Sequence, residues 1–191
     1  MNIREILNLK VGGQWLVSPS AEETIFCREM FSEDHKDIEK MVLEFASDKI
    51  YPNLHKIESL DESLSRSIMK EMGGLGLIGV DAPEKYGGTE LDKITACIVT
   101  EGVGSSGSSS FGCTFGVQTG IGSLGIVFFG TEEQKSKYLP KLMSGEWIAA
   151  YGLTEPSSGS DALSAKTTAV LSEDGKHYIL NGEKQFISNG G

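Results

Sequence analysis

Small hydroxyl and glycine residues follow an apolar stretch in the segment YGLTEPSSGSD, residues 151–161. Gly159 leaves room for a phosphate group near the backbone, because glycine has no side chain, and Ser160 can donate a hydrogen bond without adding negative charge. Thr154 can donate to a ring carbonyl or nitrogen. These residues suit a ligand-binding loop, but they are also typical of a surface turn, which the local sequence alone favours.

A second segment of interest is NGEKQFISNGG, residues 181–191. Phe186 has an aromatic face on which a planar ligand can stack, and Ser188 has a hydroxyl group. Tyr151, in the first segment, also has an aromatic ring. The alternative for both aromatic residues is a place in the protein core.

Strand-like segments surround these two motifs. WIAAYGLTE (residues 147–155) is typical of a buried strand, AKTTAVL and HYIL have strand composition, and EKQFIS follows them. Asp174-Gly175 and Asn181-Gly182 lie between these runs as hairpin signals. We therefore expect an antiparallel sheet that begins near Trp147. Because so short a sheet is marginal alone, we also expect a truncated chain or a partner that completes the sheet.

Helices are expected before the sheet. Ser20-x-x-Glu23 predicts a short capped helix, and Ser32 begins a second helix that Pro52 ends. Asp61 caps a third, which ends at Gly73 and Gly74. DAPEKYGG (residues 81–88) is a predicted loop, and two further helices are expected over residues 91–103 and after the capping box Thr131-x-x-Gln134, the latter with Pro140 near its end. The fold class is therefore α+β, with helices first and an antiparallel sheet after them.

Composition excludes several classes of function. With 39% hydrophobic and 23% charged residues, the 191-residue chain is an ordinary globular protein. Its net charge of -10 makes nucleic acid an improbable partner, since no positive field would attract phosphates. The N-terminus does not resemble a signal peptide, so we expect a cytoplasmic location.

The cysteine and histidine residues show no metal-binding spacing, and we expect no metal site. Cys27, Cys97 and Cys113 are widely separated, and we interpret them as free thiols, buried or without a role, in a reducing compartment.

Two patterns in the middle of the chain can mislead. Residues 102–107 match G-x-G-x-x-G, but a helix is expected before them and no acidic residue follows at the spacing of a dinucleotide site. Residues 102–131 contain no charged residue, yet half of them are Gly or Ser, and Gln118 lies among them. We therefore expect a buried helix and no transmembrane segment.

The ordered motifs resemble the acyl-CoA dehydrogenase family, in particular its long-chain and very-long-chain branch. Besides the two segments above, FGTEEQKSKYLPKLMSGEWIAAYGLTEPSSGSDA and LGLIGVDAPEKYGG carry the resemblance. It implies an N-terminal extension (1–30), a helical N-terminal domain (31–146) and part of a middle β-domain (147–191). The C-terminal helical bundle of the family is absent from the sequence, and so is the glutamate that usually serves as its catalytic base.

The resemblance implies FAD as the cofactor. Tyr151, Leu153 and Thr154 would then line the flavin ring, Gly159 and Ser160 would approach the pyrophosphate, and Phe186 and Ser188 would meet the other side of the ring. The family frequently has Trp and Thr where this chain has Phe186 and Ser188, so we expect flavin binding with altered packing. Glu155 and Asp161, which could pass for an acid–base pair, are interpreted as structural loop residues.

The implied reaction is oxidation of a fatty acyl-CoA to the trans-2-enoyl-CoA, with electrons passed to an electron-transfer flavoprotein. Gly122, Ser123 and Ser160 would contact the substrate, and small residues beside the acyl channel would leave volume for a long chain. The small residues meant lie in the run Gly120, Ile121, Gly122, Ser123 and Gly125, and close helix packing is the alternative explanation for its glycines. The intact protein is expected to be a homo-oligomer. A non-catalytic flavin-binding or assembly module is the alternative function.

Overall fold

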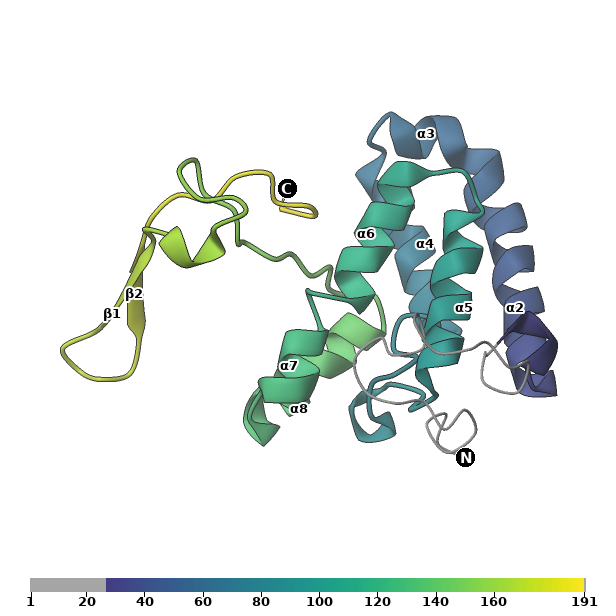
Figure 1. Cartoon of the computed structure of the whole chain (residues 1–191), viewed down its shortest axis with the longest axis horizontal. Coiled ribbons are helices and arrows are strands. Elements are labelled where there is room, and N and C mark those ends of the chain that lie inside the picture. Colours follow the sequence, from purple (N-terminus) through teal and green to yellow (C-terminus); the bar gives the residue numbers. More distant parts are fainter. Residues whose placement is uncertain (1–26, 191) are drawn as a thin grey trace, which may run out of the picture.

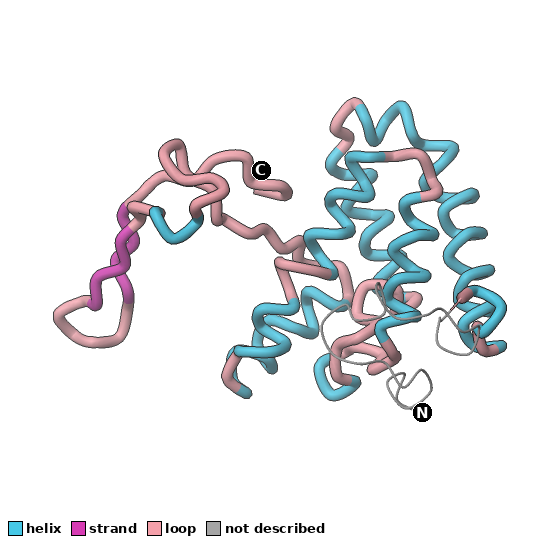
Figure 2. The backbone as a smooth tube through the Cα atoms, in the orientation of Figure 1, coloured by secondary structure: helices cyan, strands magenta, loops and turns pink. Residues whose placement is uncertain are grey.

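The computed structural model describes residues 27–190 as a group of helices followed by a small β-hairpin (Figure 1). The predicted helix at Ser20-x-x-Glu23 lies outside the described residues, as does most of the predicted N-terminal extension. Figure 2 shows the helical part as one packed group and the strands as a separate ribbon beyond it. The α+β fold class predicted from the sequence is confirmed.

The first helices form one bent path. A short helix, η3 (Arg28–Met30), precedes α2 (Glu33–Phe45), which continues through the π-helical turn η4 (Ala46–Ile50) and the 3₁₀ turn η5 (Tyr51–Asn53) to α3 (Leu54–Glu58). The Ser32 side chain accepts a hydrogen bond from the His35 N–H, while His35 Nδ1 accepts one from the Ser32 N–H. Pro52 lies in η5, where the regular helix ends as predicted, because proline cannot donate a backbone hydrogen bond.

The remaining helices begin at the predicted caps. Asp61 accepts a hydrogen bond from Leu64 N–H and begins α4 (Glu62–Gly74), and Thr131 and Gln134 form the capping box of α8 (Glu132–Met143). Between them the helical elements are η6 (Glu84–Tyr86), α5 (Lys93–Gly104), α6 (Ser109–Thr119) and α7 (Leu124–Phe129).

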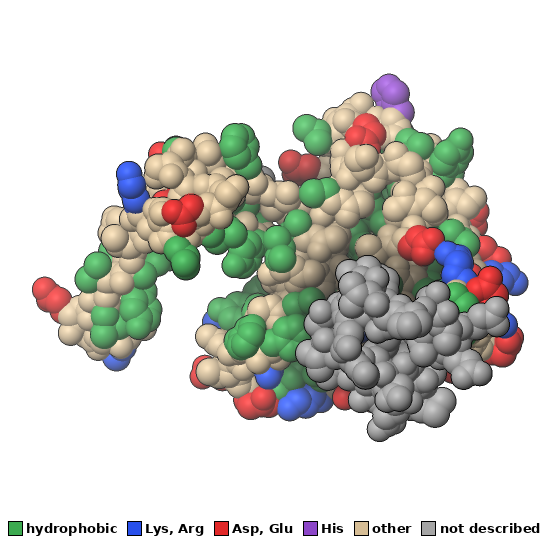
Figure 3. All heavy atoms as spheres, viewed as in Figure 1, with side chains coloured by type: hydrophobic (Ala, Val, Ile, Leu, Met, Phe, Trp, Pro, Cys, Tyr) green, Lys and Arg blue, Asp and Glu red, His purple; other side chains and the backbone are tan. Residues whose placement is uncertain are grey.

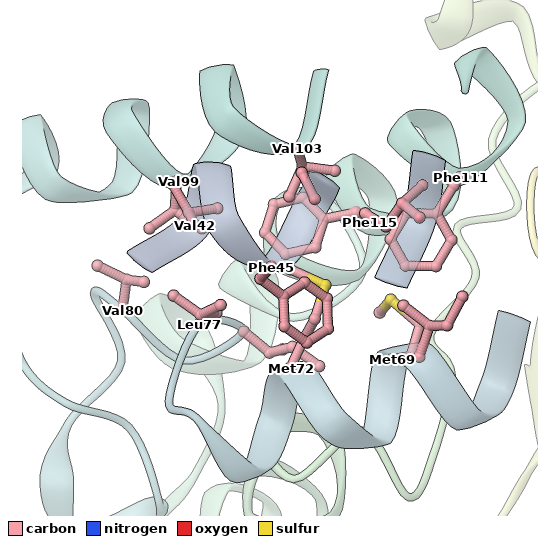
Figure 4. Packing of buried hydrophobic residues seen from close by; sticks show 14 of the residues in the cluster. Val42, Phe45, Met69, Met72, Leu77, Val80, Val99, Val103, Phe111 and Phe115 are labelled. Carbon is pink, nitrogen blue, oxygen red and sulfur yellow. The ribbon is translucent and has the colours of Figure 1, made fainter. Parts of the chain in front are cut away.

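The main core lies between α2, α4, α5 and α6 (Figure 4). Phe111 and Phe115 come from α6, Met69 and Met72 from α4, and all four are almost completely buried. At Gly102 a Cβ atom would lie 2.4 Å from Val42 Cγ1, so glycine is required where α5 approaches α2. The first glycine of the G-x-G-x-x-G match is therefore a helix-packing residue, and a helix precedes it, as expected.

The uncharged segment forms two helices. Ser109–Phe129 is long and apolar enough to cross a membrane by length and composition alone. However, α6 ends at Thr119 and α7 begins only at Leu124, and a lipid-exposed break in a helix leaves backbone groups without partners. Because Phe111, Phe115 and Gln118 are buried against other helices, we interpret α6 as a core helix.

The hairpin has no protein cover among the described residues. β1 (Thr168–Leu171) pairs antiparallel with β2 (Tyr178–Asn181), with Thr168 opposite Asn181 and Leu171 opposite Tyr178. The predicted turn at Asp174-Gly175 is present, and Gly175 has a φ of 67°. All eight strand residues are exposed, including five large apolar ones. Figure 3 shows these side chains on a hairpin that projects away from the helices.

Several predictions about local structure are wrong. Residues 147–155, predicted as a buried strand, form an extended segment outside any strand ladder, because side chains rather than a neighbouring strand bind much of its backbone. The sheet begins at Thr168 and not near Trp147, and residues 183–188 are also not a strand, so Asn181-Gly182 is not a hairpin turn. The three cysteines are free thiols as expected, but all are exposed.

Candidate functional site

The two segments singled out in the sequence meet in the structure. Gln185 N–H donates to the Thr154 carbonyl at 2.9 Å, and Lys184 Nζ donates to the Leu153 carbonyl at 3.0 Å. Gln185 Nε2 also donates to the Glu155 carbonyl at 3.3 Å. Residues 151–155 and 184–188 therefore form one surface, which we call the paired loops.

Glu155 holds the paired loops together from inside. Its side chain is only 4% exposed and accepts hydrogen bonds from Lys184 Nζ at 2.7 Å, Lys166 N–H at 2.6 Å and Thr167 N–H at 3.0 Å. The Lys184 hydrogen bond, with those from residues 167 and 166, lowers the pKa of Glu155 from 4.5 to about 2. A carboxylate so firmly held in its charged form is a poor proton acceptor, which agrees with its interpretation as a structural residue.

Asp161 also has contacts within its own loop. Its carbonyl accepts a hydrogen bond from Ser158 Oγ at 2.7 Å, and its carboxylate accepts one from the Ser164 hydroxyl. Asp161 precedes η7 (Ala162–Ser164), so these bonds fix the short helical turn. Glu155 and Asp161 thus hold separate parts of the loop and do not form an acid–base pair.

The outer face of the paired loops exposes groups that can bind a ligand. Tyr151 and Leu153 are 47% and 43% exposed. Within the part of the chain that the structure describes, the backbone N–H groups of Leu153, Thr154 and Gly159 donate to no protein acceptor. A Cβ atom at Gly159 would meet nothing within 4 Å, and Ser160 is exposed beside it. Open space and unpaired donors therefore occur together where the sequence suggested a phosphate.

Phe186 has a strained backbone and an open side chain. Its φ is 56°, a left-handed value that is rare for a bulky residue, and its side chain is 87% exposed. Such strain is retained where the surrounding structure enforces it, and it is concentrated at ligand sites. The predicted alternative of a core aromatic does not fit either Phe186 or Tyr151.

Gln118 connects the paired loops to the helices. Its side chain is fully buried and uses all its hydrogen-bonding groups except one acceptor lone pair. Nε2 donates to the carbonyls of Leu142 at 2.8 Å and Trp147 at 2.9 Å, and Oε1 accepts from Ala149 N–H at 2.6 Å. We call residues 144–150, between α8 and the paired loops, the linker; these hydrogen bonds fix it along α6.

The predicted substrate contacts at Gly122 and Ser123 are not on an open surface. A Cβ atom at Gly122 would lie 2.6 Å from the Ala149 Cβ and 2.8 Å from the Val117 carbonyl oxygen, and Ser123 is 1% exposed. Gly122 allows the linker to lie close to the chain before α7, and Ser123 is the buried residue directly before that helix. For Gly122 the structure favours the close-packing alternative; Ser160, the third predicted contact, is exposed.

Sequence reasoning missed three residues that position the site: Gln118, Lys184 and Asn189. Gln118 was visible as the sole amide within a long uncharged segment, a context in which a buried polar group must find partners. Lys184 and Asn189 both lie in the quoted motif at 181–191, and Asn before Gly is a residue pair that accepts a left-handed backbone. Nothing local indicates which atoms they bind.

Together these features define a class of protein in which a helical domain is tied, through Gln118 and Asn189, to loops at the start of a β-domain. Residues 32–146 match the family model described as "Acyl-CoA dehydrogenase, N-terminal domain", and residues 150–191 match the "Acyl-CoA dehydrogenase, middle domain". This chain belongs to the acyl-CoA dehydrogenase family.

Individual relatives agree with this assignment. A "Probable acyl-CoA dehydrogenase" of Bacillus subtilis is 48% identical over 97% of this chain and 31% of its own length. The very long-chain specific enzyme of Macaca fascicularis mitochondria is 47% identical over 68% of this chain and 20% of its own. The mitochondrial isovaleryl-CoA dehydrogenase of Pongo abelii is 38% identical over 83% of this chain and 37% of its own. The chain thus spans about a third of the relatives it matches, or less.

The fold also matches a solved structure. An acyl-CoA dehydrogenase from Bacillus anthracis, crystallised with FAD, superposes with a TM-score of 0.87 and 49% identity. The match covers 92% of this chain and 30% of that one. The helical part and the start of the β-domain are therefore arranged as in that protein.

Proposed function

We propose that this chain forms the flavin-facing part of an FAD-dependent acyl-CoA dehydrogenase. The observation that carries the proposal is that unpaired backbone donors at Leu153 and Thr154 and an exposed, strained Phe186 belong to loops joined by the Gln185–Thr154 hydrogen bond, in a member of this family. A flat heteroaromatic ring needs such an aromatic face and such donors. FAD, when bound, supplies the acceptor for a hydride.

Each part of the surface has a distinct role in the proposal. Tyr151, Leu153 and Thr154 border one side of the ring, with N–H groups available to its polar edge. Phe186 and Ser188 border the other side. Gly159 and Ser160 receive the pyrophosphate, and the negative charge of Glu155 does not oppose it because Lys184 pairs with that carboxylate.

The proposed substrate is a fatty acyl-CoA thioester. It loses a proton from the α-carbon and a hydride from the β-carbon and becomes the trans-2-enoyl thioester, and an electron-transfer flavoprotein is the proposed partner. A cavity of about 500 Å³ lies beside α5 and α6, with Gly116 and Gly120 on its α6 wall and Ala96 and Cys97 on its α5 wall. Small residues on α5 and at the end of α6 leave volume for an acyl chain in this cavity, whose rim also carries Asp81, Lys93 and Glu101.

FAD binding by the purified chain tests the cofactor proposal. We expect added FAD to lose fluorescence on binding, and Gly159→Asp to weaken binding at least tenfold, because the new carboxylate would repel the phosphates. The structure has free space for this side chain, so the fold should be retained. Gly104→Asp is the matched control, since Gly104 is also exposed with nothing near its Cβ position. Absence of FAD binding by the wild-type chain would overturn the proposal and favour a non-catalytic assembly module.

Turnover of acyl-CoA substrates in a protein that includes the C-terminal bundle tests the substrate proposal. We expect kcat/KM to be higher for long straight-chain thioesters than for medium-chain or isovaleryl thioesters. Gly116 lines the cavity and an added Cβ there would meet nothing within 4 Å, so Gly116→Leu should fill part of the cavity and shift the preference toward shorter chains. A clear preference for branched or medium chains in the wild type would contradict it.

A further inference from the structure

Asn189 ties the end of the paired loops to the helical domain. Its side-chain Nδ2 donates hydrogen bonds to the Thr114 carbonyl in α6, at 3.2 Å, and to the Ala149 carbonyl in the linker, at 3.0 Å. One amide group thus bridges the helix, the linker and the loop. An isosteric carboxylate could not make these bonds, because both partners are acceptors.

The bridge is completed from the other side by Gln118. Gln118 accepts the N–H of Ala149, and Asn189 donates to the carbonyl of the same residue. Both peptide groups flanking Ala149 are therefore held by side-chain amides, one from α6 and one from the loop.

The backbone at Asn189 suits this role. Its φ is 61°, and asparagine is among the few residues other than glycine that adopt this conformation readily. The residue before it, Ser188, lies with its Oγ 3.4 Å from Cys113 Sγ, one residue before Thr114 in α6. Two consecutive loop residues thus contact two consecutive residues of α6. These two contacts fix how far the loop lies from α6 and how it is oriented relative to the helix axis.

We propose that Asn189 is a positioning residue that sets where Phe186 and Ser188 stand relative to α6. This inference rests on the proposed flavin site and adds a residue that does not itself touch the ring. Among the described residues, Ser188 and Asn189 make the polar contacts of residues 182–190 with the helical domain and the linker. Without the Asn189 amide, the loop loses its register on the helix, and its hydrogen bonds to residues 153–155 open more often.

Hydrogen exchange and FAD binding together test the role of Asn189. We expect Asn189→Asp and Asn189→Gly to speed exchange of the Gln185 and Gly190 amides, which bond to the Thr154 and Ile187 carbonyls. We expect about a tenfold increase in the Kd for FAD and an altered visible circular dichroism of bound flavin. Asn189→Gly keeps the left-handed backbone, so an effect shared with Asn189→Asp is due to the lost amide.

Asn53→Asp is the matched control. Asn53 also donates from Nδ2 to a backbone carbonyl, that of Lys49 at 2.9 Å, but it lies in η5. It should leave exchange at residues 183–190, FAD affinity and the flavin spectrum unchanged.

Three outcomes would overturn the inference. Wild-type exchange rates in both Asn189 variants would show that the amide does not hold the loop. Faster exchange with unchanged FAD affinity and spectrum would show that the loop does not position the ring site. A loss of helical signal in both variants would indicate a general role in stability. If the wild-type chain binds no FAD, the proposed function fails, while the exchange comparison still decides whether the amide holds the loop.

Discussion

Replacing Gln118 by leucine should destabilise the chain by more than most core substitutions of similar size. Leucine fills nearly the same volume, so the effect comes from hydrogen bonds and not from a cavity. Gln118 satisfies the carbonyls of Leu142 and Trp147 and the N–H of Ala149. The Leu142 carbonyl retains a second partner, the Gly145 N–H at 3.2 Å. The Trp147 carbonyl and the Ala149 N–H lose the partner that the structure gives them.

The size of the effect follows from these two groups. A buried polar group left without a partner costs about 1–3 kcal/mol, so two such groups cost about 2–6 kcal/mol. Trp147 is partly exposed, and water can reach its carbonyl at part of that cost. We therefore expect a loss of about 3 kcal/mol in the free energy of unfolding. For a chain of this length, that loss lowers Tm by about 6–12 °C.

Thermal unfolding followed by circular dichroism measures this loss. Gln134→Leu is the matched control, because Gln134 accepts a hydrogen bond from Thr131 N–H at 2.9 Å at an exposed position. Gln118→Glu should lower the free energy of unfolding further at neutral pH, because a buried carboxylate is costly. Burial raises the pKa of the new carboxyl above its unfolded value, so part of the lost stability should return as the pH falls and the carboxyl is protonated. A Tm for Gln118→Leu within about 2 °C of that of Gln134→Leu would refute the reasoning.

Two further predictions concern the loop carboxylate and a glycine turn. Because the pKa of Glu155 is lowered from 4.5 to about 2, its pairing with Lys184 should stabilise the paired loops above about pH 4.5 and be lost as the pH falls toward 2. Limited proteolysis from pH 7 to pH 2.5 with an acid-stable protease should show this transition in the wild type, whereas Glu155→Gln should be cut readily throughout; identical pH profiles would contradict the assignment. Gly145→Ala should cost about 2 kcal/mol or more, since φ is 70° and the new Cβ would lie 2.5 Å from the Met69 carbonyl oxygen. Gly74→Ala, with nothing near its Cβ position, should be neutral or stabilising by up to about 1 kcal/mol in the same denaturation assay.

The helix boundaries could be predicted because they depend on neighbouring residues. Ser32, Asp61 and Thr131 each bind the backbone of the residue three positions later, so the cap and its partner occur in one short stretch of sequence. The hairpin turn at residues 174–175 is equally local. These predictions required no knowledge of how the helices pack.

The linker could not be predicted in the same way. Residues 147–155 have the composition of a buried strand, but a strand also needs a partner, and that choice is made by tertiary structure. Here Gln118 lies 31 residues before Ala149 and Asn189 lies 40 residues after it, and their amides take the place of a neighbouring strand. No local pattern specifies such a pairing.

The candidate site was predicted in part. The meeting of the two loop segments was inferred from their resemblance to a family, and the bond from Gln185 to Thr154 agrees with it. That these segments bind FAD stays a prediction. The left-handed backbone of Phe186 could not be predicted from the sequence, because the contacts of residues 184–189 with the first loop and α6 are tertiary.

The hairpin, uncovered among the described residues, has a consequence for the isolated chain in concentrated solution. Five large apolar side chains on two short strands, with both strand edges open among the described residues, form a template to which another copy can add by backbone pairing. A net charge of -10 opposes that approach, but mutual repulsion reaches only about 8 Å at physiological ionic strength. We therefore expect added salt to shift the isolated 191-residue chain from dispersed molecules toward β-rich aggregates.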